Sequence, residues 1–231
     1  MINNALIVYA FFVMLWQLLI IANVIKYKNN VACILYKKCY TYLIISTIIL
    51  LLIYYSSVTL ILIPVIGLFE IVYTYIKSKQ RIFILLASLI IYLLISGLFV
   101  CYLTKHDVVN MIKLYLLVNV FDANSQLFGM LCGKRKILPS ISPNKTVEGS
   151  ICGLASIVLM SFFLYSPSVL SLIYVLCVAI LAFIGDMLAS IYKRKIGIKD
   201  FNKLLPNHGG ILDRFDSYIM VGAFIYLLFI A

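Results

Sequence analysis

Long apolar runs recur from one end of the 231-residue sequence to the other, separated by short polar segments. Hydrophobic residues make up 65% of the chain and charged residues only 12%, which excludes an ordinary soluble domain. Runs of this length predict membrane-spanning helices, and the alternating pattern of barrel strands is absent. We therefore predict an all-α polytopic membrane protein made of a single integral membrane domain, residues 1–231.

Hydropathy predicts about eight spans. They are expected near residues 5–25, 41–56, 58–76, 82–104, 109–131, 147–165, 168–192 and 215–230. The first run follows no basic segment and precedes no small-residue cleavage site, so we expect a span there rather than a removable signal peptide. The six cysteines show no CxxC spacing and are interpreted as small buried hydrophobic residues.

Basic residues gather in alternate connections between these spans. All of them except Lys105 and Lys113 follow the first, third, fifth or seventh span. The positive-inside rule then predicts an N-terminus outside, and cytoplasmic loops that include residues 132–146 and 193–214. The net charge of +11 suits anionic lipid headgroups and phosphates in the bilayer. No basic helix or aromatic platform accompanies it, so we expect no nucleic-acid partner.

Two acids stand inside predicted spans, where a carboxylate is costly unless it is paired or bound to a metal. Asp186 precedes Ser190 and Lys193 at spacings that place all three on one helix face. Asp122 belongs to a polar stripe and indicates a polar cavity or substrate channel. The stripe also contains Asn119, Gln126, Gly129 and Gly133. The structural alternatives are a salt bridge between Asp186 and a lysine, and plain helix packing for the stripe.

The segment from residue 133 to residue 149, GKRKILPSISPNKTVEG, carries a second group of candidates. Ser142, Lys145 and Thr146 stand just before a predicted helix, where a cation, hydroxyls and free backbone N–H groups can hold a phosphate. Glu148 can cap that helix, and the neighbouring basic residues can act only as topology signals.

A polar, charge-dense island, SIYKRKIGIKDFNKLLPNHGGILDRFD, occupies residues 190–216. Asp213 and Asp216 stand where the last helix begins, and such carboxylates can hold a hard cation. Gly209 and Gly210 allow close approach of backbone N–H groups to a phosphate, and His208 is a candidate general base. The basic candidates for phosphate contacts are Lys193, Arg194, Lys199 and Arg214. Because no thiolate cluster or HExxH motif is present, the pattern favours Mg²⁺ and phosphate chemistry over zinc hydrolysis.

The island resembles the pattern S-x-x-K-R-x4-K-D-x5-P-x-H-G-G-x-x-D-R-x-D of the phosphatidate cytidylyltransferase (CDP-diacylglycerol synthase) family. Residues 142–149 are similar to its S-P-x-K-T-x-E-G, and Asp122, Gly129, Gly133 and Lys134 are similar to its D-x-x-A-Y-x-x-G-x-x-x-G-K. The sequence departs from these patterns at Ser125, Gln126 and Asn207, where the family usually has alanine, tyrosine and glycine.

This resemblance implies transfer of CMP from CTP to phosphatidic acid, giving CDP-diacylglycerol and pyrophosphate, in a bacterial inner membrane. The resemblance covers roughly residues 119–220. We divide the single domain into apolar N-terminal helices, residues 1–105, and catalytic helices and loops, residues 106–231. The resemblance also implies dependence on Mg²⁺ held by Asp186 and Asp213, with Asp216 as a further candidate ligand. The sequence leaves open a second cation and a homodimer. The alternatives are a CTP-dependent enzyme acting on another lipid phosphate or on a polyprenol, and a non-enzymatic cation transporter.

Overall fold

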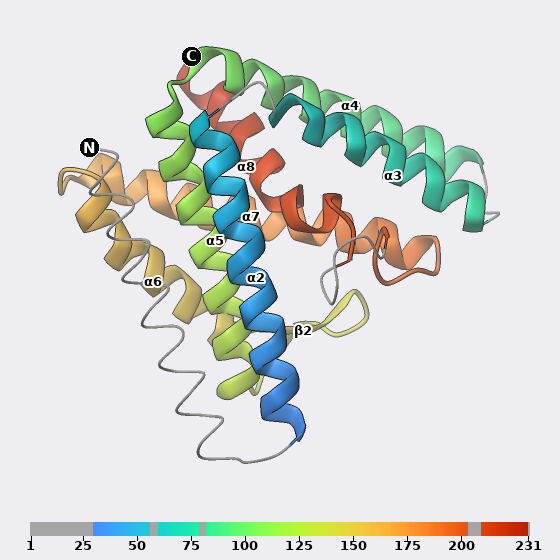
Figure 1. Cartoon of the computed structure of the whole chain (residues 1–231), viewed down its shortest axis with the longest axis horizontal. Coiled ribbons are helices and arrows are strands. Elements are labelled where there is room, and N and C mark those ends of the chain that lie inside the picture. The colour runs from blue at the N-terminus through green and yellow to red at the C-terminus, as the bar shows by residue number, and fades with distance from the viewer. Residues whose placement is uncertain (1–29, 56–59, 79–81, 203–208, 231) are drawn as a thin grey trace.

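The computed structural model describes residues 30–55, 60–78, 82–202 and 209–230. In this part the chain forms α2 (Asn30–Tyr55), α3 (Leu62–Ser78), α4 (Ile82–Lys105), α5 (Val108–Leu131), β1 (Lys136–Leu138), β2 (Ser142–Thr146), α6 (Val147–Leu164), α7 (Val169–Lys195) and α8 (Leu212–Ile230) (Figure 1). The span expected at residues 5–25 lies outside the described residues. Three of the described helices, α4, α6 and α7, are long and apolar enough to cross a membrane, as expected of an integral membrane protein.

The predicted bounds of α2 are wrong. The helix begins at Asn30, whereas the hydropathy pattern predicted a loop up to residue 40 and a helix from residue 41. Lysine is a good helix former, so Lys37 and Lys38 lower the hydropathy of this segment without ending the helix. Hydropathy therefore located the apolar part of α2 and missed the helical turns that precede it.

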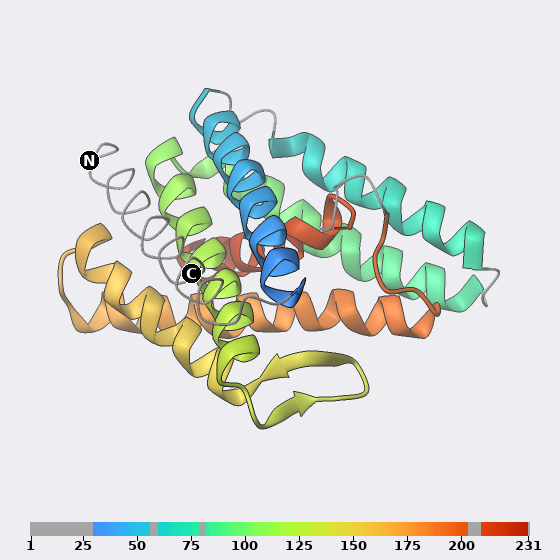
Figure 2. The ribbon, with the colours of Figure 1, turned by 60° about the horizontal axis from the view of Figure 1, so that its bottom comes forward.

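The segment between α5 and α6, predicted as a polar loop at residues 132–146, contains an antiparallel β-hairpin. Lys136 pairs with Thr146 and Leu138 with Ser142. The backbone N–H of Ile141 donates to the carbonyl of Leu138 at 3.1 Å, which closes a four-residue turn with Pro139 at its second position. Proline favours that position because its fixed φ matches the turn. The hairpin extends beside the end of α5 (Figure 2).

Glycine and serine residues bring α5 and α6 into close contact. A Cβ on Gly149 would collide with the carbonyl oxygen of Ser125 and would lie 2.9 Å from Cα of Gly129. A Cβ on Gly153 would lie 2.9 Å from the carbonyl oxygen of Phe121. Such small residues let the backbones of membrane helices approach each other closely. This packing fixes the position of the hairpin relative to α5.

The last helix, α8, lies in the interior of the molecule. It packs most extensively against α4 and α7, with further contacts to α3 and α5. Its first half carries buried residues on all sides, including Phe215, Tyr218, Ile219 and Val221. Gly185 on α7 permits the crossing with α8, because a Cβ there would lie 2.7 Å from Cβ of Met220. The polar beginning of α8 is therefore held between apolar helices.

Candidate active site

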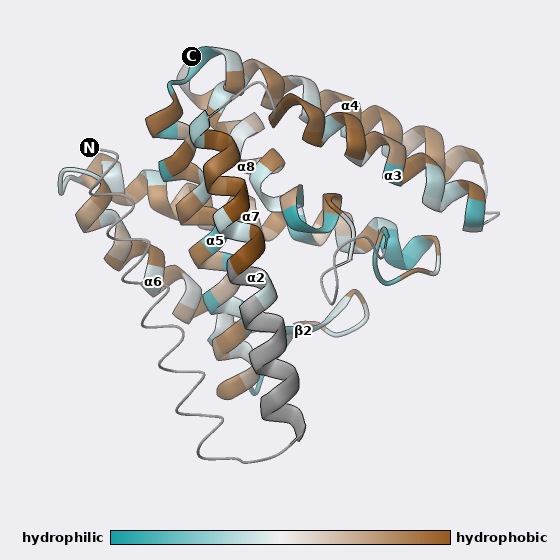
Figure 3. Cartoon of the chain, in the orientation of Figure 1, coloured by the Kyte–Doolittle hydropathy of each residue, from teal (hydrophilic) through white to brown (hydrophobic). Residues whose placement is uncertain are grey.

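Hydrophilic segments gather where α7 ends, along the chain that follows it, and at the beginning of α8 (Figure 3). The end of α7 is a glycine-terminated cap. Gly197 has φ of +76°, and the N–H of Ile198 donates to the carbonyl of Lys193 at 2.9 Å. This hydrogen-bond pattern ends a helix and reverses the chain. The reversal returns the chain from α7 toward α8, so that acids and bases from both helices meet.

Six charged side chains form what we call the acid–base cluster. Its members are Asp122 of α5, Lys145 of β2, Asp186 and Lys193 of α7, and Arg214 and Asp216 of α8. The three carboxylates are close enough for each to feel the charge of the other two. Lys145 and Arg214 lie within electrostatic range of both Asp122 and Asp186. Such a concentration of charge in an apolar protein indicates a functional interior.

Asp186 is bound to a lysine of the hairpin. Nζ of Lys145 lies 2.6 Å from Oδ2 of Asp186, and Oγ of Ser190 donates to Oδ1 at 3.3 Å. Nζ of Lys145 also lies 4.4 Å from the centre of the Phe183 ring. The predicted shared face of Asp186 and Ser190 is therefore confirmed. The salt bridge that the sequence offered as the structural alternative is present as well.

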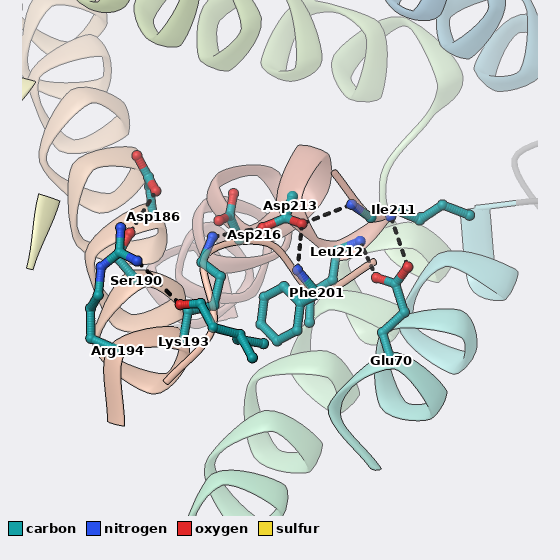
Figure 4. Close-up of polar contacts among 12 residues, drawn as sticks. Glu70, Asp186, Ser190, Lys193, Arg194, Phe201, Ile211, Leu212, Asp213 and Asp216 are labelled. Carbon is teal, nitrogen blue, oxygen red and sulfur yellow. Dashed lines mark hydrogen bonds and ion pairs between the residues drawn. The ribbon is translucent and has the colours of Figure 1, made fainter. Parts of the chain in front are cut away.

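Asp213 holds the chain that precedes α8. Its Oδ1 accepts a 2.6 Å bond from Nζ of the buried Lys193. Its Oδ2 accepts from the backbone N–H groups of Phe201 at 2.9 Å and Gly210 at 2.8 Å (Figure 4). The ring of Phe201 stacks on that of Tyr192, with centroids 5.7 Å apart. Both carboxylate oxygens of Asp213 are thus engaged in positioning the loop and Lys193.

Glu70 of α3 holds the next two backbone N–H groups, although the sequence analysis did not single it out. Its two carboxylate oxygens accept from Ile211 at 3.0 Å and from Leu212 at 2.8 Å (Figure 4). A Cβ on Gly210 would lie 2.6 Å from Oε1 of Glu70, so a larger residue there would displace this carboxylate from its two donors. One signal was available, because Glu70 is the single acid in the first 105 residues. An acid in an apolar span indicates a buried polar partner.

The segments 132–146 and 193–214, which were predicted to lie on the same side of the membrane, are in contact. Nε of Arg194 donates to the carbonyl of Ile141 at 3.0 Å, and Nη1 donates to the carbonyl of Ile198 at 3.2 Å. The hydroxyl of the buried Thr146 accepts from the N–H of Gly149 at 3.2 Å and caps α6. Glu148 accepts from the backbone N–H groups of Lys134 and Arg135. The hairpin is therefore held in place by hydrogen bonds of Arg194, Thr146 and Glu148.

The structure also describes the surroundings of Lys199, Ser142, Gly209 and Arg214. Lys199 is exposed, and Ser142 is half-buried in β2. Gly209 has φ of +81°, which favours glycine, and a Cβ there would lie 2.5 Å from Oδ2 of Asp213. Nε of Arg214 is buried and has no hydrogen-bond partner in the described part of the chain. His208 lies outside the described residues.

The donor atoms of the cluster suit a hard cation such as Mg²⁺, which prefers carboxylate oxygens. Within the described residues, no three acidic, histidine or cysteine side chains come together as a ready metal site. The ammonium group of Lys145 occupies the position beside Asp186 that a bound cation would take. One oxygen of Asp216 accepts from the N–H of Ser217 at 2.8 Å. Asp186, Asp213 and Asp216 each have the carboxylate chemistry for a cation, and Asp213 differs from the other two in that two backbone N–H groups of the loop also bind it.

The sequence profile of the cytidylyltransferase family matches residues 1–231. The chain belongs to this cytidylyltransferase family. A phosphatidate cytidylyltransferase from Staphylococcus haemolyticus is 39% identical over 141 residues, which cover 58% of this chain and 54% of that protein. The corresponding proteins of Staphylococcus saprophyticus and Staphylococcus aureus are 41% and 40% identical over 122 residues, covering 50% of this chain and 47% of theirs. This member of the cytidylyltransferase family thus spans about half the length of the curated relatives that it matches.

Proposed function

We propose that the protein transfers CMP from CTP to phosphatidic acid, forming CDP-diacylglycerol and pyrophosphate. The observation that carries this proposal is the acid–base cluster, in which acids of α5, α7 and α8 meet bases of β2, α7 and α8. The cluster has the charges that a metal–nucleotide complex and a lipid phosphate require. Family membership and the names of the relatives support the same reaction.

We further propose a multi-pass arrangement of about eight spans in the bacterial inner membrane, with the N-terminus outside. The distribution of lysine and arginine supports this topology through the positive-inside rule. The hairpin and the chain from residue 193 to residue 214 then face the cytoplasm, where CTP is dissolved. The lipid substrate reaches the same cluster from the inner leaflet.

In the proposed reaction an oxygen of the phosphatidate phosphate forms a bond to the α-phosphorus of CTP. The bond from that phosphorus to the bridging oxygen of the β-phosphate breaks, and pyrophosphate leaves with the electron pair. Because the attacking phosphate oxygen is already ionised at neutral pH, the step needs no general base. The protein therefore acts mainly by positioning the two phosphates and by balancing their charge.

The described residues divide this work. Lys145, Lys193 and Arg214 supply positive charge for the phosphates, and Lys145 leaves Asp186 when substrate binds. Asp186 and Asp216 would hold Mg²⁺, with Asp122 beside them, and Asp213 keeps Lys193 and the loop in place. Bound Mg²⁺ would neutralise charge on the triphosphate and the leaving pyrophosphate.

Purified protein in mixed lipid–detergent micelles tests the reaction. We expect release of pyrophosphate from CTP that requires both phosphatidate and Mg²⁺. Release of CDP would indicate a polyprenol-type kinase, and ion flux without CTP turnover would indicate a transporter; either result contradicts the proposal. Replacing phosphatidate with other lipid phosphates tests substrate choice, and an equal or faster rate with one of them would overturn phosphatidate as the substrate.

Two matched variants test the roles of the acids. Asp216→Asn removes a proposed ligand, so the Mg²⁺ concentration for half-maximal rate should rise at least about tenfold, as metal sites lose that much even from outer contacts. Asp213→Asn should lower the unfolding temperature and the rate, with little change in that Mg²⁺ concentration. The reverse pattern would make Asp213 the ligand.

A further inference from the structure

A cavity of about 340 Å³ lies between α4, α7 and α8, with Ile71 of α3 at one side. Its walls are almost entirely apolar, and they include Ile84, Ile91 and Ile95 of α4 and Leu188 and Ala189 of α7. Its volume is at the lower end of the range for ligand pockets, about 300–1,000 Å³. The hydrogen bonds of Tyr92 to the carbonyl of Pro64 and of Tyr192 to that of Ile71 fix two tyrosines of the wall.

The residues of α4 that line the cavity repeat with helical spacing. They are Phe83, Ile84, Ala87, Ser88, Ile91, Tyr92 and Ile95. This spacing gives one continuous face of α4, about 18 Å long at 1.5 Å per residue. One leaflet contributes about 15 Å to a hydrocarbon core of about 30 Å. Because Phe83 and Ile91 are exposed, the cavity opens on the outer surface of the helices.

The polar end of the cavity meets the acid–base cluster at Asp216. Asp216 belongs both to the cavity wall and to the cluster, where it interacts with Asp186 and Lys193. Lys195, exposed at the end of α7, also lines the cavity. On the proposed topology all three helices contribute their cytoplasmic halves. The cavity thus extends from the reacting groups into the inner leaflet.

We propose that this cavity binds one acyl chain of the lipid substrate while its phosphate lies at the acid–base cluster. The proposal rests on the proposed function and adds the place and the number of the bound chains. An amphipathic ligand matches both ends, because the basic residues of the cluster and Lys195 attract an anionic headgroup and the apolar walls accept hydrocarbon. The second chain remains among the bulk lipids, since the volume is small for two.

Steric filling of the cavity tests the proposal. Ala189→Phe places a large ring in the wall, and we expect at least a fivefold rise in the KM for a long-chain phosphatidate. The KM for CTP and the rate with a short-chain phosphatidate should change less than twofold. Ala155→Phe adds the same ring at an exposed position of α6 and serves as the matched control. If Ala189→Phe does not fold, Ala87→Phe introduces the ring from the opposite wall.

Two results would overturn the acyl-chain site without affecting the proposed reaction. The first is that the wild-type enzyme forms CDP-lipid and both cavity variants keep the wild-type KM for long-chain phosphatidate.

Photocrosslinking tests the cavity independently of the reaction. If the wild-type enzyme forms no CDP-lipid, the proposed function fails, and this second experiment still decides whether the cavity binds the lipid. A phosphatidate with a diazirine near the end of one chain should label peptides containing residues 83–95 and 185–195. Equal labelling by the matching phosphatidylcholine would mean an unselective lipid contact and would also overturn the site.

Discussion

At the level of single residues, the acids at the candidate site are of two kinds. Asp213 and Glu70 together accept the backbone N–H groups of Phe201, Gly210, Ile211 and Leu212. A buried N–H without a partner costs about 1–3 kcal/mol, so these bonds determine the path of the chain into α8. Asp186 and Asp216 make few backbone bonds and interact with other charges. Asp213 and Glu70 therefore hold the chain that leads into α8, whereas Asp186 and Asp216 remain available to bind a cation or to act on the substrates.

The Glu70 contacts predict a specific loss. Glu70→Gln retains one acceptor and turns an NH₂ group toward a backbone N–H, whereas Glu70→Ala removes both acceptors. Since a hydrogen bond to a charged group contributes about 1.5–3 kcal/mol, we expect both variants to lower the free energy of unfolding, alanine more strongly. The rate of CDP-lipid formation should fall in Glu70→Gln at temperatures where the protein is still folded.

Thermal unfolding in detergent and assays below the transition measure the two effects. Phe69→Leu, a change at an exposed position of the same helix, α3, is the control and should shift neither. A Glu70→Gln protein with wild-type stability and rate would mean that α3 does not position the loop. A loss of stability alone would limit Glu70 to a structural role.

At the level of elements, hydropathy predicted α4, α6 and α7 to within a few residues at each end. Their composition differs sharply from the polar segments around them, so the boundary is visible in the sequence. The hairpin was missed because SISPNKT has no alternation of apolar and polar residues, and the turn at Pro139 was its one local signal. The sequence also did not predict that Thr146 caps α6, because a hydroxyl residue before a helix suits both a phosphate site and an N-cap.

The α5–α6 contact gives a prediction for its glycines. A Cβ on Gly149 would meet backbone atoms, which cannot rotate away, so Gly149→Ala should lower the free energy of unfolding by about 1–3 kcal/mol. Gly97→Ala is the control, because a Cβ at Gly97 meets nothing within 4 Å. In that helix alanine should be neutral or should stabilise by up to about 1 kcal/mol. Denaturant titration in micelles compares them, and equal stability of the two variants would contradict the close packing.

At the level of the whole molecule, the sequence predicted which segments meet but not how they are held. The pattern of lysine and arginine placed residues 132–146 and 193–214 on one face, and the contact of Arg194 with Ile141 confirms that these segments meet. The central position of α8 and the hydrogen bond that the N–H of Leu212 donates to Glu70, 142 residues away, depend on tertiary packing. No local pattern encodes such pairs, so they became visible only in the fold.

The proposed topology makes the ends of α6 face opposite sides of the membrane. Cys132 is exposed beside the hairpin, and Ser166 is exposed between α6 and α7. In a background without other cysteines, a membrane-impermeant maleimide should label Cys132 in inverted vesicles but not in intact spheroplasts. The thiol introduced by Ser166→Cys should show the opposite pattern, because α6 is long enough to span the membrane between the two positions. Labelling of both thiols from the same side would show that α6 does not cross, and the cytoplasmic assignment of the acid–base cluster would lose its basis.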